Sequence, residues 1–404
     1  MMRAMKNSGV SWIGTIPVDW EVRRTKYCFT VNHGSDPKTD SGNTPVYGSG
    51  NNSFKTCEEF KVGPAVLVGR KGTINIPQWI VGNYWNVDTA FDVQPKGNYD
   101  LKLYYYASMC FDYDAVATQT ALPSMTQFDY LNFRLPFMDA DIQQQIVSYL
   151  DAKCDAIDKA IAHKRSVIEK LKEYRTAVIT KAVTKGLNPD VEMKDSGNDI
   201  IGFVPKDWKC KRMKFIVDVV RGGSPRPIEQ YLSDKGYNWI KIGDATNNGK
   251  YINNTQQKII PDGLSKTRFV KKNTLLLTNS MSFGHPYFLN IDGCIHDGWL
   301  AFSNYKDVTK EFLYYVLISN TSMAQFSTSV EGSVVVNLNI QKVRNSFVAL
   351  PAIAEQQQIA SYLDDKCNKI DIAIHQQEQV IDKLEEYRKS VIYYAVTGKK
   401  EVSA

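Results

Sequence analysis

Residues 141–184 read DIQQQIVSYLDAKCDAIDKAIAHKRSVIEKLKEYRTAVITKAVT, and this stretch decides the fold. From Leu150 its apolar residues recur in steps of 7, 4, 7, 3, 7 and 4, and Lys, Asp, Glu, Arg, Thr and small residues fill most other positions. This spacing is the a/d seam of a coiled coil rather than the broader face of a core helix. No proline or glycine interrupts the run before Gly186. The pattern predicts one helix of about 40 residues, on the order of 60 Å long.

A second stretch, residues 355–397, repeats this pattern as EQQQIASYLDDKCNKIDIAIHQQEQVIDKLEEYRKSVIYYAVT. The local text matches at a constant offset of 213, with Gln143 aligned to Gln356 (356 − 143 = 213). Because each helix supplies the apolar partner that the other needs, we predict an antiparallel two-helix coiled coil. The alternative is two independent helices, each packed on its own domain. The predicted seam comprises Leu150, Ile157, Ile161, Ile168, Leu171, Val178, Leu363, Ile370, Ile374, Ile381, Leu384 and Val391.

The duplication extends to the start of each half. Ile13-Gly14-Thr15-Ile16-Pro17-Val18-Asp19-Trp20 matches Ile201-Gly202-Phe203-Val204-Pro205-Lys206-Asp207-Trp208. This opening motif should form an extended surface turn that packs its tryptophan on a core. The chain thus reads as opening motif, body and helix, twice over.

In the first body, residues 65–68 (AVLV) predict a buried strand and residues 101–109 a short aromatic helix, and in the second body residues 275–278 (LLLT) predict the corresponding strand. Each body thus combines short buried strands, one aromatic helix and many polar loops, which is typical of a mixed α+β domain. The fold class we predict is α+β, with two pseudo-repeated mixed domains separated by the coiled coil. We divide the chain into a first domain (1–140), a first long helix (141–184), a linker with the second opening motif (185–206), a second domain (207–353), a second long helix (354–397) and a tail (398–404).

Composition fits a cytoplasmic protein. The chain has 404 residues, 43% of them hydrophobic, a net charge of +6 and seven cysteines without a C-x-x-C pair. A disulfide framework is not expected from this pattern, and no apolar run is long enough to span a membrane. The mild basicity permits a nucleic-acid partner without requiring one.

Motifs for catalysis are missing from the sequence. It contains no G-x-G-x-x-G, no Walker lysine and no Asn/Asp-Pro-Pro-aromatic pocket of a base methyltransferase. Residues 189–194 carry Asp190 and a Glu-x-Lys almost contiguously in a linker, unlike a nuclease site with these groups on separate strands. The five histidines show no zinc spacing. We therefore predict no catalytic residue and no metal site.

Polar loops at strand ends favour DNA binding instead. Arg can grip guanine, and Asn or Gln adenine, by paired hydrogen bonds, while Lys and backbone amides hold phosphates. The candidate DNA contacts are Tyr47, Arg70, Lys71, Gln119, Thr120, Arg221, Ser224, Arg226, Asn279 and Ser280. The same residues could also be ordinary solvated loops.

The duplicated motifs together resemble the DNA-specificity subunit of type I restriction–modification systems. They are the opening Ile-Gly-x-(Ile/Val)-Pro-x-Asp-Trp, an exit Leu-Pro, then Gln-Gln-Gln-Ile, Tyr-Leu-Asp-x-Lys-Cys and Lys-Leu-x-Glu-Tyr-Arg, in the same order in both halves. The resemblance covers nearly the whole chain.

The family implies two target-recognition domains, each reading one half of a bipartite, asymmetric site in double-stranded DNA. It implies partners too, namely two methyltransferase (M) subunits docked on the helices and restriction (R) subunits. S-adenosylmethionine, ATP and Mg would be bound by those partners and none by this chain. The competing interpretation is a two-headed adaptor that binds protein instead of DNA.

Overall fold

The structure, a computed structural model, describes residues 3–118, 120–245, 249–279, 284–327 and 338–402. It divides into two compact units. Unit 1 comprises Met1–Arg165 and Gln377–Ala404, and unit 2 comprises Ser166–Gln376. Each unit therefore combines one body, the first half of the helix that follows it and the second half of the other helix.

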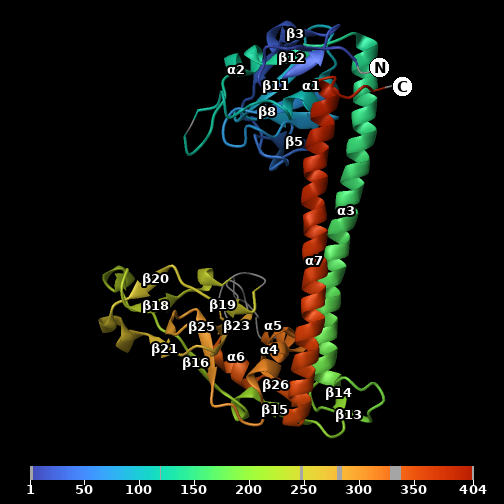
Figure 1. The fold of residues 1–404 in the computed structure, drawn as a ribbon. Coiled ribbons are helices and arrows are strands. Elements are labelled where there is room, and N and C mark those ends of the chain that lie inside the picture. Colours follow the sequence, from blue (N-terminus) through green and yellow to red (C-terminus); the bar gives the residue numbers. More distant parts are fainter. Residues whose placement is uncertain (1–2, 119, 246–248, 280–283, 328–337, 403–404) are drawn as a thin grey trace. The chain divides into compact units, whose positions relative to one another are not determined.

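Two long helices pack together, α3 (Ala140–Lys185) and α7 (Ile353–Val396) (Figure 1). In unit 1, Arg388 Nη1 lies 2.8 Å from Asp158 Oδ1, and in unit 2, Arg175 Nε lies 3.2 Å from Asp371 Oδ1. Later residues of α7 thus face earlier residues of α3, as antiparallel helices require. The predicted α+β fold class with an antiparallel helix pair is confirmed.

The predicted seam positions face inward to different degrees. Eight of them are at most 9% exposed, and Leu150 and Leu363 are fully buried. Leu171, Val178, Ile374 and Leu384 are half-buried. Within the last two turns of each helix a second apolar residue is buried, Ile179 at 1% and Ile392 at 2% exposure. The helix ends therefore pack on the bodies as well as on each other.

Each opening motif packs its tryptophan on the end of the helix from the other half of the chain. Trp20 and Trp208 are each 2% exposed, as predicted for packing anchors. Trp20 shares a core with Val391, Ala395 and Val396 of α7, and Trp208 shares one with Ile179, Ala182 and Val183 of α3. Repetition alone did not predict this exchange of partners.

Glycines end both long helices in the same way. Gly186 (φ +74°) and Gly398 (φ +68°) adopt the left-handed conformation that glycine favours at a helix C-terminus. A Cβ on Gly398 would lie 2.6 Å from the ring of Pro17 and 2.9 Å from that of Trp20. The tight contact with the opening motif therefore also requires a glycine.

Unit 1 contains two four-stranded sheets, ordered β6-β5-β10-β7 and β4-β11-β8-β9, and the pairs β1-β2 and β12-β3. Its strands are β1 (Met5–Asn7), β2 (Thr15–Pro17), β3 (Glu21–Arg24), β4 (Phe29–His33), β5 (Thr44–Tyr47), β6 (Lys55–Cys57), β7 (Lys61–Val62), β8 (Ala65–Gly69), β9 (Gln78–Ile80), β10 (Asn83–Asn86), β11 (Ala90–Pro95) and β12 (Arg134–Phe137). Its short helices are α1 (Leu101–Ser108) and α2 (Gln127–Asn132).

Unit 2 contains two five-stranded sheets, ordered β16-β25-β22-β23-β19 and β17-β20-β18-β24-β21, and the pairs β13-β14 and β15-β26. Its strands are β13 (Met193–Asp195), β14 (Phe203–Pro205), β15 (Lys209–Arg212), β16 (Asp218–Arg221), β17 (Leu232–Ser233), β18 (Tyr237–Ile240), β19 (Tyr251–Ile252), β20 (Gln257–Ile259), β21 (Arg268–Val270), β22 (Leu275–Thr278), β23 (Pro286–Leu289), β24 (Gly293–Ile295), β25 (Trp299–Ser303) and β26 (Phe347–Leu350). Its short helices are α4 (Lys310–Ile318), α5 (Asn320–Ser327) and α6 (Ile340–Asn345).

One buried glutamine fastens each body to its long helix, and it comes from the repeated Gln-Gln-Gln-Ile. Gln143 Oε1 accepts from the Asp100 amide (2.7 Å), and Gln143 Nε2 donates to the carbonyls of Asn98 (3.1 Å) and Met138 (2.9 Å). Gln356 makes the same three hydrogen bonds. It accepts from the Thr309 amide (2.8 Å) and donates to the carbonyls of Asp307 (2.8 Å) and Pro351 (3.0 Å). The repeat thus encodes a shared joint.

The aspartate of the repeated Tyr-Leu-Asp makes a second joint. Asp151 accepts from Tyr106 Oη at 2.6 Å and pairs with Lys102 Nζ at 2.8 Å. Asp364 accepts from Tyr315 Oη at 2.5 Å and pairs with Lys250. Lys102 belongs to α1, whereas Lys250 immediately precedes β19. A lysine of the body therefore pairs with the aspartate at this helix position in both units, but the lysine comes from a different element in each body.

None of the described helices is both long and apolar enough to cross a membrane.

Candidate nucleic-acid interface

Three neighbouring strands of unit 1, β4, β8 and β11, place the candidate loops at one end of their sheet. In β11, Phe91 pairs with His33 of β4 and with Val68 of β8. Beyond β4, the Ser35 amide donates to the Asn86 carbonyl at 3.0 Å. A Cβ on Gly34 would lie 2.1 Å from the Val87 carbonyl oxygen, so this close approach requires a glycine.

The loop after β8 holds Arg70 in a defined position. The Arg70 amide donates to the Thr89 carbonyl at 2.7 Å, which fixes the backbone. Its Nη1 donates to the carbonyl oxygen of Asp88 at 3.1 Å and to the carboxylate oxygen Oδ2 of the same residue at 3.2 Å. The side chain nevertheless stays 42% exposed. Arg70 is thus anchored at one nitrogen and open to solvent elsewhere.

Two further candidate loops meet the Arg70 loop. The Gly72 amide donates to the Pro123 carbonyl at 2.9 Å, and the Met125 amide donates to the Arg70 carbonyl at 2.9 Å. This pairing brings Lys71 and Thr120, both exposed, to one side of unit 1. A Cβ on Gly72 would lie 3.5 Å from Ser49 Oγ, so the segment after Tyr47 reaches the same place.

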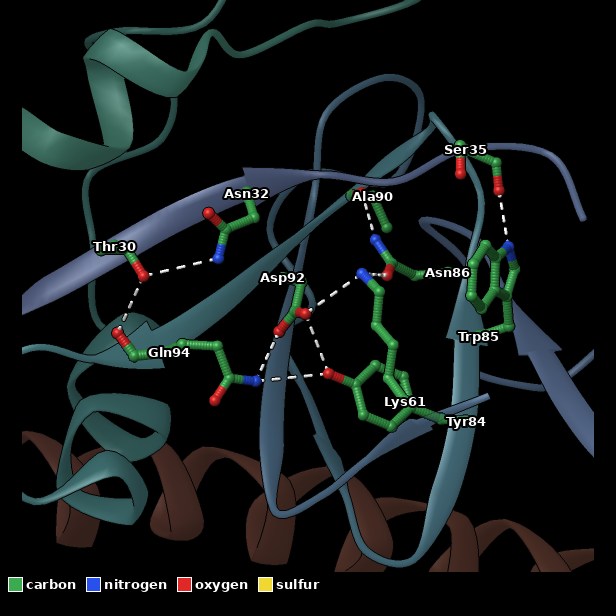
Figure 2. Close-up of polar contacts among 10 residues, drawn as sticks. All are labelled: Thr30, Asn32, Ser35, Lys61, Tyr84, Trp85, Asn86, Ala90, Asp92 and Gln94. Atoms are coloured by element: carbon green, nitrogen blue, oxygen red, sulfur yellow. Dashed lines mark hydrogen bonds and ion pairs between the residues drawn. The ribbon is translucent and has the colours of Figure 1, made fainter. Parts of the chain in front are cut away.

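Unit 1 also contains a polar network around Asp92 (Figure 2). The carboxylate of Asp92, only 4% exposed, accepts from Tyr84 Oη (2.9 Å) and Gln94 Nε2 (2.8 Å) and pairs with Lys61 Nζ (3.2 Å). Lys61 Nζ also donates to Asn86 Oδ1 at 2.7 Å. Burial, with the Asp92 charge, raises the pKa of Tyr84, so the phenol stays protonated and donates. The network connects β7, β10 and β11.

Unit 2 repeats the three-strand frame with β16, β22 and β25. In β25, Leu300 pairs with Arg221 of β16 and with Leu277 of β22. The Gly223 amide donates to the Ile295 carbonyl at 3.1 Å, and a Cβ on Gly222 would lie 2.2 Å from the His296 carbonyl oxygen. These contacts match those of Ser35 and Gly34, so Asp297 occupies the position of Asp88.

Four candidate residues of unit 2 converge on Asp297. Its carbonyl oxygen accepts from Arg221 Nε at 2.8 Å and from Asn279 Nδ2 at 3.0 Å. Its carboxylate accepts from Ser224 Oγ at 2.9 Å and lies 3.7 Å from Arg226 Nη2. Asn279 is 5% exposed and already bonded, whereas the Arg226 side chain is 79% exposed. Arg226 is therefore far more accessible to a ligand than Asn279.

A cavity of about 650 Å³ lies beside this cluster. Arg226, Lys241, Gln257 and His296 line it with polar groups, and Pro225 and Trp239 supply apolar walls. Lys241 and Gln257 were not among the sequence-based candidates. Gln257 lies in β20 and Lys241 directly follows β18, two strands of the sheet β17-β20-β18-β24-β21, which reaches the cavity only through tertiary packing.

His296 lies beside Asp297. Its Nδ1 accepts from the Gly298 amide at 2.9 Å and lies 2.9 Å from Asp297 Oδ1. Burial lowers the pKa of His296, and the Asp297 charge opposes that shift. Because Nδ1 accepts from the Gly298 amide, it has no proton to donate to Asp297, whereas Ser224 Oγ donates to this carboxylate.

The sequence matches the family described as Type I restriction modification DNA specificity domain over residues 17–171 and 205–383. The chain belongs to this family. The resemblance drawn from the repeated motifs is thereby confirmed, and the chain is a type I specificity subunit.

Similar proteins include two curated specificity subunits. The type I restriction enzyme MjaVIII specificity subunit of Methanocaldococcus jannaschii is 25% identical over 351 residues, covering 83% of this chain and 76% of that protein. The EcoBI specificity subunit of Escherichia coli is 24% identical over 379 residues, covering 88% and 77%. A solved structure from work on complex assembly and conformational transition of the type I R-M system has a TM-score of 0.71 at 14% identity, covering 95% of this chain and 99% of that one. That likeness supports the specificity-subunit fold.

The assignment of individual DNA contacts in this specificity subunit stays a prediction. The structure gathers Arg70, Lys71 and Thr120 in unit 1 and Arg221, Ser224 and Arg226 in unit 2. Tyr47 is half-buried beside an apolar cluster of unit 1, and Asn279 is buried. Gln119 and Ser280 lie outside the described residues. No group of three or more described His, Cys, Asp or Glu residues could hold a metal ion.

Proposed function

We propose that this specificity subunit reads a bipartite, asymmetric site in double-stranded DNA, one half with the body of each unit. One observation carries the proposal. The two bodies build the same strand-end frame but line it with different polar side chains, Arg70 and Lys71 in one and Arg221, Ser224 and Arg226 in the other. A shared frame with different donors suits two different half-sites.

The repeated helices support docking of two M subunits. Tyr174 and Tyr387 occupy equivalent positions of the Lys-Leu-x-Glu-Tyr-Arg motif and are 48% and 52% exposed. One surface presented twice suits two copies of one partner. In this proposal the chain itself is non-catalytic and works in the cytoplasm. The M and R subunits bind S-adenosylmethionine, ATP and Mg.

Mapping methylated adenines tests this function. The chain would be expressed with its cognate M subunit, and the M subunit would also be expressed alone. We expect modification at one gapped asymmetric motif, only when both are present. An assembled complex that modifies no motif would contradict the proposal.

Salt dependence separates DNA reading from the protein-adaptor alternative. A subunit that neutralises several phosphates releases counterions, so its affinity for duplex DNA falls steeply as salt rises. The purified complex would be titrated with duplex at several salt concentrations. Affinity for duplex that is weak at every salt concentration would favour the adaptor.

A further inference from the structure

An acidic residue lies at the centre of both proposed reading surfaces. Asp88 and Asp297 each stand two residues before the third strand of the frame. In both units the residue that follows the second strand of the frame donates to the backbone carbonyl oxygen of this aspartate. After β8, Arg70 Nη1 donates to the Asp88 carbonyl at 3.1 Å, and after β22, Asn279 Nδ2 donates to the Asp297 carbonyl at 3.0 Å. A carboxylate repels DNA phosphates, so phosphate binding does not explain why an aspartate stands at either position.

In unit 1 the carboxylate orients an arginine. The carbonyl oxygen and the carboxylate oxygen Oδ2 of Asp88 both accept from the same nitrogen of Arg70, Nη1. Among the described residues, the structure gives no protein partner to Nε and Nη2 of Arg70. These two groups form one edge of the guanidinium and can donate in parallel, which is the geometry that recognises O6 and N7 of guanine.

In unit 2 the carboxylate of Asp297 contacts both ends of a short turn, and the last residue of this turn is Arg226. Ser224 Oγ donates to Asp297 Oδ1 at 2.9 Å, and Arg226 Nη2 lies 3.7 Å from Oδ2. The two carboxylate oxygens thus hold both ends of the segment from Ser224 to Arg226. This segment lines the cavity of about 650 Å³ and carries the more exposed arginine.

We propose that Asp88 and Asp297 are positioning residues, which orient Arg70 and Arg226 so that each body reads a guanine in its half-site. The inference rests on the proposed function. The Arg70–Asp88 pair is solvent-exposed, and in the other pair Arg226 is 79% and Asp297 31% exposed. Ion pairs this open to water add little stability. The role of each aspartate is therefore to order a side chain, and its removal should change discrimination between DNA sequences more than it changes folding.

The experiment uses the full chain in complex with its M subunit. Binding would be measured for the modified motif and for duplexes in which each guanine of one half-site is replaced. For Asp88→Asn and Asp88→Ala, we expect the preference for a guanine in the unit 1 half-site to fall by about 5- to 50-fold, with the other half-site unaffected. Asp297→Asn and Asp297→Ala should act likewise on the unit 2 half-site.

A charge control separates ordering from electrostatics. Asp36 is exposed and lies just beyond Ser35 in the loop after β4. Asp36→Asn removes the same charge, so it should raise affinity for all duplexes equally and leave their ratio unchanged. Equal loss of discrimination in Asp36→Asn and Asp88→Asn would overturn the proposal, because charge alone would then explain it.

Two other outcomes would also overturn it. If Arg70→Ala loses discrimination but Asp88→Ala does not, Asp88 does not position the arginine. If Asp88→Ala weakens both half-sites equally, its role is general stability. Failure of the proposed function is distinct from both, because the unaltered complex would then prefer no duplex at all.

Discussion

The interiors of the two units contrast most clearly at one position of the shared frame. Asp92 in β11 and Ala301 in β25 are equivalent by strand register. Asp92 follows Phe91 and Ala301 follows Leu300, and Phe91 and Leu300 each pair with both neighbouring strands of the frame. In unit 1 the position carries a buried charge held by Lys61, Tyr84 and Gln94. In unit 2 it belongs to an apolar cluster with Ile240, Leu276 and Trp299.

Backbone pairing, and not interior chemistry, therefore defines the three-strand frame that the two units share. A buried carboxylate needs its full set of donors, whereas an apolar cluster needs only shape and volume. A single substitution therefore cannot convert the interior of one unit into that of the other. By contrast, the glutamine joint to the long helix makes the same three hydrogen bonds in both units.

Ala301→Asp should have the largest effect, because it moves the charge of unit 1 into the apolar interior of unit 2. Ala301 is 2% exposed and packs in a cluster of apolar side chains that includes Ile240, Leu276 and Trp299. We expect unit 2 to lose at least about 4 kcal/mol of stability. Denaturant unfolding of the full chain would measure it. Asn253→Asp is the control, because it adds the same charge on the surface and keeps the oxygen that accepts from Asn290. Equal stability of the two variants would refute the argument.

Gln143→Leu and Gln356→Leu should cost about the same in their own units. Each change removes three hydrogen bonds and leaves a buried amide and two carbonyls unpaired, at a cost of about 2–4 kcal/mol. Hydrogen exchange would assign the loss to a unit. Gln144→Leu and Gln357→Leu, at neighbouring exposed positions, should be nearly neutral. A strongly unequal pair of losses would show that the joints are not equivalent.

Arg70→Lys should separate base reading from phosphate binding in unit 1. Lysine keeps the charge but cannot donate two parallel hydrogen bonds. We expect a loss of about 1–3 kcal/mol in discrimination at the unit 1 half-site, with the salt dependence unchanged. Arg70→Ala should lose both. Competition binding with duplexes altered in one half-site gives the measurement. If Arg70→Lys discriminated as well as the native chain, Arg70 would be a phosphate contact.

Acidification should produce the smallest effect, and we expect it in unit 2. Burial, followed by the nearby Arg175, lowers the pKa of His285 from its ordinary value of 6.5. The unfolded chain therefore binds a proton more readily, so the stability from this group is present above pH 6.5 and is lost as pH falls towards the lowered value. Hydrogen exchange of unit 2, corrected for intrinsic rates, should show protection falling between pH 7.5 and 5.5. His285→Phe should flatten that slope, and an unchanged slope would exclude His285 as its source.

Local sequence patterns predicted the elements well. The predicted strand at Ala65–Val68 is β8, the helix at Leu101–Met109 is α1, and the strand at Leu275–Thr278 is β22. Each lies in a run whose side chains are mostly buried, so periodicity and length sufficed to identify it. The division into six segments stays a prediction. Each compact unit combines one half of α3 with one half of α7.

The sequence by itself determined the helical seam, the repeat and the family, because each is written in consecutive residues with a regular period. Only the tertiary structure decided which helix end each tryptophan packs against, and that Asp88 and Asp297 gather the candidate arginines. It alone placed Lys241 and Gln257 beside Arg226. These groups are brought together by strand pairing over long separations, and no local spacing in a chain records which strands will be neighbours.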